Sequence, residues 1–128
     1  MKTPEFPLDE IQRQAALERT GLLDTDPEER FDRFTRMASK AFNVPIALVS
    51  LVDKNRQWFK SCQGLEASET SRDVSFCGHA ILDSGLLVIE DTLEDQRFAD
   101  NPLVTEAPNI RFYAGAPLHN SEGFRLGT

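Results

Sequence analysis

Residues 75–82 combine a hydroxyl, a thiol, an imidazole and a glycine at the predicted start of a short helix. A helix start leaves backbone N–H groups unpaired, carries a partial positive charge and lowers the pKa of a nearby thiol. Cys77 could therefore be a reactive thiol, with His79 as its base or as a metal ligand. The alternative is a helix capped by Ser75 and buried, since Cys77 shares a face with Ala80 and Ile81. Cys-x-His without a second ligand pair is a weak metal signal, so the spacing favours the buried helix.

The segment 110–118 offers a second set of groups that could bind a ligand. Alternation predicts that one face of this strand belongs to the core. Those core positions are Ile110, Phe112, Ala114, Ala116 and Leu118. The other face carries Arg111 and Tyr113 beside Gly115, a cation and a phenol with free space, as a pocket wall requires. Alternatively, Arg111 pairs with a carboxylate and Tyr113 covers a sheet edge.

Other residues could complete such a pocket. Phe76 lies within the short helix itself, and Trp58 lies on the predicted strand 56–62. A packed strand tryptophan is the commoner outcome for Trp58. Asp91 and Phe98 belong to a polar region after the predicted strand 86–91. The acidic spacing there does not match an EF-hand loop, which favours a hydrogen-bonded turn network over a calcium site.

Two amphipathic helices are predicted to support these segments. The first spans residues 8–20, with Leu8, Ile11 and Ala15 on its apolar stripe and Gly21 as its C-terminal cap. The second begins with Asp26 as cap and Pro27 as first helical residue, and ends before Pro45. Its apolar stripe is Phe31, Phe34, Ala38, Ala41 and Phe42.

Strand patterns follow the helices. Residues 46–52 predict a central strand covered on both faces, and 56–62 complete a hairpin around a turn at 53–55. Residues 63–74 are a predicted polar loop, 92–109 are mostly loop with a helical turn near 93–98, and 124–128 begin a further element. Helices grouped early and strands joined by hairpins or loops predict an α+β domain around an antiparallel sheet.

The composition of the chain limits the functions that are plausible for it. The chain has 128 residues, enough for one domain, and a net charge of −7, which disfavours nucleic acid and anionic lipid as partners. No apolar run reaches the roughly 20 residues that span a bilayer, and the first residues do not resemble a secretory signal. Only Cys62 and Cys77 are present, which predicts reduced thiols in a cytoplasmic protein.

Taken together, these segments resemble a bacterial GAF domain over nearly the whole chain. The motifs that carry the resemblance are Leu22–Thr25, Pro45–Asp53, Arg56–Ser61, Ser75–Ile81, Asp95–Val104 and Ile110–Leu118. The resemblance implies a PAS-related antiparallel sheet with helices (8–43) on one face, and a ligand cavity formed by the sheet and loops of 45–128. It also implies a strand and a helix after Thr128, so we expect 1–128 to be a single GAF domain truncated at its C-terminus. An open sheet edge would then favour self-association or marginal stability.

The resemblance implies a sensory or regulatory module in cytoplasmic signal transduction, without catalytic or metal-binding residues. Its output domain would be a diguanylate cyclase, a cyclic-di-GMP phosphodiesterase or a histidine kinase. We expect an unknown small molecule as ligand, no required cofactor, and a homodimer formed through the N-terminal helices. The expected ligand contacts are Trp58, Ser75, Phe76, Cys77, His79, Asp91, Phe98, Arg111 and Tyr113.

Three alternatives remain open. A GAF-fold thiol enzyme resembling free methionine sulfoxide reductase would use Cys62 and Cys77 as attacking and resolving thiols. A haem or bilin sensor would use His79 or Cys77, although Gly78 separates the two where phytochrome-type domains have them adjacent. A purely structural module would dimerise without a ligand.

Overall fold

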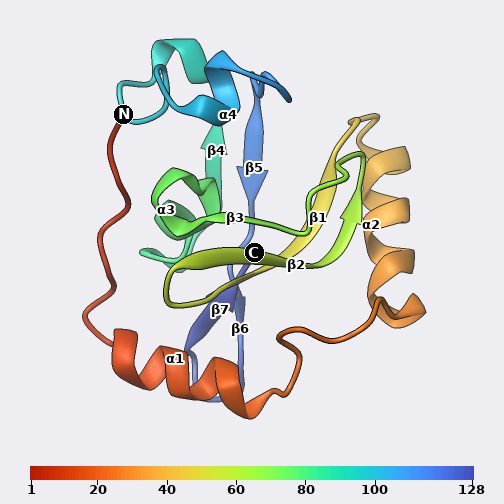
Figure 1. The fold of residues 1–128 in the computed structure, drawn as a ribbon, viewed down its shortest axis with the longest axis vertical. Coiled ribbons are helices and arrows are strands. Elements are labelled where there is room, and N and C mark those ends of the chain that lie inside the picture. The colour runs from red at the N-terminus through yellow and green to blue at the C-terminus, as the bar shows by residue number, and fades with distance from the viewer.

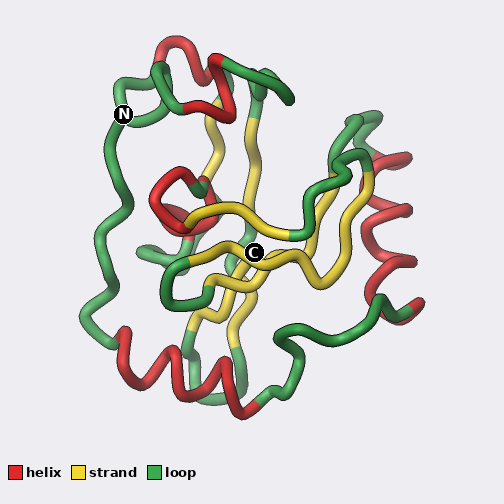
Figure 2. Tube along the Cα trace, viewed as in Figure 1, coloured by secondary structure: helices red, strands yellow, loops and turns green.

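The computed structural model describes all 128 residues, Met1–Thr128. Its main sheet has five strands in the order β3-β2-β1-β7-β6, and β4 and β5 form a separate pair (Figure 1; Figure 2). All strand pairs are antiparallel, which confirms the predicted α+β class. The strands are β1 (Ala47–Val52), β2 (Arg56–Gln63), β3 (Glu69–Ser71), β4 (Leu87–Ile89), β5 (Tyr113–Gly115), β6 (Leu118–His119) and β7 (Arg125–Gly127). The helices are α1 (Glu10–Arg19), α2 (Glu29–Ala41), α3 (Phe76–Ala80) and α4 (Pro102–Thr105), with 3-10 turns η1 (Arg72–Val74) and η2 (Thr92–Glu94).

The main sheet separates two apolar cores. On one face, α1 covers a core made of Ala16, Leu17, Leu51, Trp58 and Leu126. On the other face, α3 packs against β1 and β5, where Cys77 and Ile81 meet Val52. A third cluster, of Phe76, Ile89, Phe98 and Val104, joins α3 to β4, α4 and the loop between them. Side chains of a strand alternate between faces, so β1 contributes Leu51 to the first core and Val52 to the second.

A β-bulge in β2 places a lysine inside the protein. Val49 pairs with Ser61 and Ser50 with Phe59, so Lys60 is the extra residue of β2. Its buried Nζ donates to the Asp26 carbonyl at 2.6 Å and pairs with Glu28 at 2.7 Å. The N-cap position is Glu28, and α2 begins at Glu29. The prediction that Asp26 caps this helix was wrong.

The buried face of α1 is not the predicted apolar stripe. Leu8 is fully exposed and the Ile11 side chain is 85% exposed, whereas Arg13 is only 1% exposed. Arg13 lies inside because its guanidinium donates to the carbonyls of Val52 (2.7 Å) and Arg125 (3.3 Å), at the ends of β1 and β7. The helix position and the Gly21 cap are confirmed, with Gly21 at φ +67°.

The predicted stripe of α2 is also misplaced. Phe34 and Ala41 are exposed, and the Phe42 side chain is 77% exposed, while Phe31 and Ala38 are half-buried. The buried residue of α2 is Thr35, which shares a hydrogen bond of 2.8 Å with Ser61 of β2. The contact between α2 and the sheet is therefore polar, and an apolar surface of α2 faces outward.

Three strand predictions need correction. Only the second half of β1 is buried, so this strand is not covered on both faces along its length. The predicted strand 110–118 is divided into β5 and β6, and its faces are reversed, because Phe112 and Leu118 are exposed and Gly115 is buried. The predicted loops also contain β3, η1 and α4.

Candidate functional site

Helix α3 is capped as the sequence predicted. The Ser75 hydroxyl accepts the Gly78 N–H at 3.0 Å and donates to the Arg72 carbonyl at 2.7 Å. The Asn101 side chain donates to the neighbouring Val74 carbonyl at 3.0 Å. Ser75 is fully buried, so its hydroxyl positions α3 and its hydrogen bonds are used within the protein.

On the sheet side of α3, one thiol and three hydroxyls meet. Ser50 Oγ and Thr128 Oγ1 donate to Cys77 Sγ at 3.0 and 2.9 Å, and the Tyr113 hydroxyl lies 3.4 Å from the same sulfur. We call these four residues the hydroxyl–thiol cluster. They come from β1, α3, β5 and the residue after β7. Burial, with the adjacent thiol, raises the pKa of Tyr113 well above its ordinary value, so this phenol stays protonated and can donate.

Aromatic rings flank the hydroxyl–thiol cluster. Phe76 stacks on Tyr113 with ring centroids 5.0 Å apart, and its ring tilts against Phe98 at 4.4 Å. Phe98 is completely buried. Together the cluster and these rings form a packed region that is polar at its centre and apolar at its border.

His79 faces a different direction from Cys77. Its Nε2 donates to the Lys2 carbonyl at 2.9 Å, and its ring meets the edge of Phe98 at 4.8 Å. Burial lowers the pKa of His79, and the nearby cations Arg97 and Lys2 act in the same direction. His79 and Cys77 therefore have separate partners, on opposite sides of α3.

Three predicted contact residues lie outside this region. Trp58 packs in the core beneath α1, on the other face of the sheet. Arg111 is exposed and donates to the carbonyls of Val104 at 2.9 Å and Ile110 at 3.2 Å. Asp91 caps η2 by accepting the Leu93 N–H. The structure thus brings together Ser75, Phe76, Cys77, His79, Phe98 and Tyr113 around α3.

Sequence reasoning missed Ser50 and Thr128. Ser50 was visible as the single hydroxyl in the apolar run 46–52, a buried polar group that needs a partner. Thr128 gave no such signal, because its place depends on the pairing of its backbone with Ser50. Cys62 donates to the Leu65 carbonyl, and both cysteines are free thiols with separate partners.

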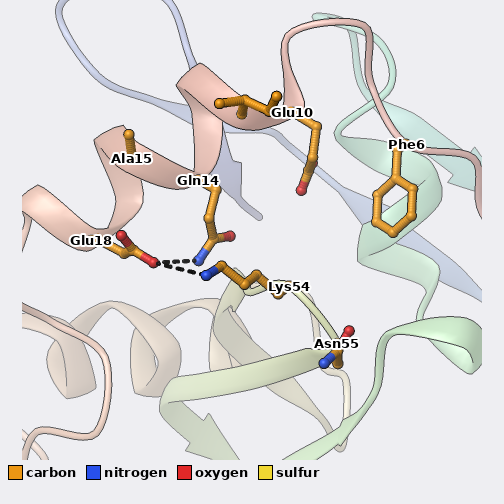
Figure 3. Close-up of a pocket in the computed structure, with 8 residues that line it drawn as sticks. Phe6, Glu10, Gln14, Ala15, Glu18, Lys54 and Asn55 are labelled. Carbon is orange, nitrogen blue, oxygen red and sulfur yellow. Dashed lines mark hydrogen bonds and ion pairs between the residues drawn. The ribbon is translucent and has the colours of Figure 1, made fainter.

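Two open grooves of about 480 Å³ each lie elsewhere, beside the turn between β1 and β2. Figure 3 shows the first, where Phe6 and Glu10 face Lys54 and Asn55 across the groove. None of the predicted contact residues lines either groove. No three His, Cys, Asp or Glu side chains are placed to hold a metal ion, and no helix is long and apolar enough to span a membrane.

Comparison with known proteins agrees with this architecture. The family model described as GAF domain matches residues 26–128, so the chain belongs to the GAF family. It is 46% identical over 128 residues to a cyclic di-GMP phosphodiesterase of Pseudomonas aeruginosa. All of this chain is aligned, but it spans only 22% of that relative's length.

Solved structures share the fold at low identity. The GAF domain of an Acinetobacter phosphoenolpyruvate-protein phosphotransferase has a TM-score of 0.58 at 15% identity, covering 91% of this chain and 73% of that chain. The A. aeolicus nlh2 GAF domain in an inactive state has a TM-score of 0.59 at 14% identity, covering 94% of this chain and 76% of that chain. These likenesses concern the fold alone.

Proposed function

We propose that this GAF domain is a regulatory module that binds a small molecule at the hydroxyl–thiol cluster. The observation that carries the proposal is the position of β1 and β7, which lie between the hydroxyl–thiol cluster and helix α1. On one face, Ser50 and Thr128 take part in the cluster. On the other side, the same two strands offer the Val52 and Arg125 carbonyls to Arg13 of α1.

This arrangement supports a route from ligand to helix. A ligand that replaces the bonds of Ser50 or Thr128 to Cys77 would move β1 and β7 relative to α3. Because Arg13 bonds to both strands, α1 would follow. Such a ligand shifts the protein between two states only if its affinity for them differs. The cluster offers hydroxyl and thiol groups without a charge, so we expect a neutral polar ligand bordered by rings such as Phe76.

The similar Pseudomonas protein suggests which output activity this module controls. Because the similar Pseudomonas protein is a cyclic di-GMP phosphodiesterase, we propose that this module controls cyclic-di-GMP turnover in the cytoplasm. A diguanylate cyclase or a histidine kinase is the alternative output.

We further propose that the module dimerises through the outward surface of α2. Phe34, Met37 and Phe42 are exposed there, on the helix layer opposite the cluster. A Met37→Glu variant should shift sedimentation velocity from dimer to monomer, and Arg19→Glu, an exposed charge change on α1 outside this surface, should not. A monomeric parent chain would exclude this interface.

A binding screen tests the ligand site. Thermal shift with cyclic di-GMP, nucleosides, amino acids and sugars selects candidates, and calorimetry then measures affinity. Ser50→Ala and Tyr113→Phe each remove one hydroxyl and should weaken binding by about tenfold, the equivalent of about 1.4 kcal/mol for one hydrogen bond. Arg111→Ala, whose guanidinium lies outside the cluster, should bind as the parent does. Unchanged affinity in both cluster variants would reject this site.

A further inference from the structure

The first seven residues form no helix or strand, yet they follow a defined path. In Figure 1 the chain runs from its N-terminus, near α4, past α3 and down to α1. The Lys2 N–H donates to the Arg97 carbonyl at 3.0 Å, and the Lys2 carbonyl accepts from His79 at 2.9 Å. Both backbone groups of Lys2 are therefore held, one by the loop after η2 and one by α3.

Side chains of this segment also pack against the protein. Pro4 and Pro7 are buried, and Phe6 lies beneath the Arg72 guanidinium at 4.4 Å. Pro4 rests directly on Gly78, where an added Cβ would lie 2.8 Å from Pro4 Cγ and 2.7 Å from the Ser75 Oγ that caps α3. A glycine at position 78 of α3 therefore permits the close approach of Pro4.

Helix α3 is consequently held from two sides. Cys77 faces the hydroxyl–thiol cluster, and Gly78 with His79 face the N-terminal segment. The segment continues into α1, where Glu10 receives two hydrogen bonds from Arg72, at 2.6 and 3.1 Å. Arg72 belongs to η1, directly before α3. Helix α1 and the N-terminal segment therefore both contact the region formed by η1 and α3.

We propose that residues Met1–Pro7 are a strap that holds α3 closed over the hydroxyl–thiol cluster, and that release of the strap is a conformational switch that opens it. The strap does not depend on a ligand at the cluster. It gives α1 a second connection to α3, in addition to the one through β1 and β7. A closed strap keeps Cys77 from solvent, and an open strap exposes it.

The test follows the Cys77 thiol in the 128-residue chain with Cys62 replaced by alanine. The rate of reaction with a disulfide reagent such as DTNB reports the fraction of open molecules. Pro4→Gly and Phe6→Ala each remove a contact of the strap without changing a residue of α3. We expect each to raise the rate by about tenfold, or about 1.4 kcal/mol. The matched control is Gly85→Ala, because a Cβ at Gly85 meets nothing within 4 Å.

Two further measurements separate strap release from general loosening. Urea unfolding of each variant gives the global stability, and NMR titration gives the pKa of His79, which changes when the ring loses its hydrogen bond to the Lys2 carbonyl and its burial beneath the strap. Faster Cys77 reaction with a changed His79 pKa in Pro4→Gly supports the strap. Rates equal to those of Gly85→Ala overturn it. A rate increase that matches the loss of global stability, with an unchanged His79 pKa, also overturns it.

Discussion

Replacing Arg13 with alanine is the sharpest test of how α1 is attached to the sheet. The Arg13 side chain is 1% exposed and bonds to Glu10 at 2.8 Å and to the Val52 carbonyl at 2.7 Å. It also bonds to the Arg125 carbonyl at 3.3 Å. Arg13→Ala therefore removes an ion pair and leaves two buried carbonyls without this donor.

The expected loss is large because the Arg13 side chain is protected from water. Removing one partner of a buried ion pair costs about 3–5 kcal/mol. Glu10 is partly exposed and keeps its bonds to Arg72, which places Arg13→Ala near the lower end, at about 3 kcal/mol. The matched control is Arg19→Ala on the same helix. Arg19 is 60% exposed and its pair with Glu122 spans 3.4 Å, so its loss should cost under about 1 kcal/mol.

Urea unfolding followed by tryptophan fluorescence measures both variants, because Trp58 lies in the core that α1 covers. The midpoint should fall strongly for Arg13→Ala with an unchanged slope, and only slightly for Arg19→Ala. Equal and small changes would show that α1 is held by Ala16 and Leu17 alone, which would refute the role of Arg13.

Further predictions concern pH and packing. Burial raises the pKa of Glu10, but hydrogen bonds from Arg13 and Arg72 outweigh it and leave the pKa below the usual 4.5. The carboxylate therefore stabilises the fold fully above about pH 4.5 and progressively less as the pH falls through the lowered value, and urea midpoints across this range should lose that slope in Glu10→Gln. Burial and the charges of Arg97 and Lys2 lower the pKa of His79, while the hydrogen bond to the Lys2 carbonyl and the charge of Asp95 oppose them, so stability is complete above about pH 6.5 and falls as acid charges the ring. His79→Gln, which keeps an N–H donor, should remove this dependence in thermal melts. Phe98→Ala should cost about 3–5 kcal/mol in urea unfolding, since the ring is fully buried, and a cost under 1 kcal/mol would show that the site collapses around it.

The helices show where the sequence pattern misleads. Periodicity correctly locates α1, but it assigns the inward face to Leu8 and Ile11, which are exposed. Arg13 takes the inward position because backbone carbonyls from strands far along the chain satisfy its guanidinium. A hydrophobic pattern reflects only the burial of apolar side chains, and it contains no information about hydrogen-bond partners far along the chain.

The candidate site, like the helices, was only partly predictable from the sequence. The Ser75 cap, and a segment around α3 that gathers Phe76 and Cys77, follow from local sequence. The partners of Cys77 do not, because Ser50 and Thr128 meet it only through the pairing of β1 with the chain after β7. The reversed face of β5 has the same cause, since tertiary contacts of Tyr113 decide which side is buried.

The most direct test of ligand binding at the hydroxyl–thiol cluster is an NMR titration of the labelled chain with the best compound from the binding screen. We predict shift changes at Ser50, Cys77 and Tyr113, and also at the Arg13 side chain across the sheet. Changes confined to Lys54, Asn55 and the grooves beside them would contradict it, because the ligand would then bind away from the hydroxyl–thiol cluster.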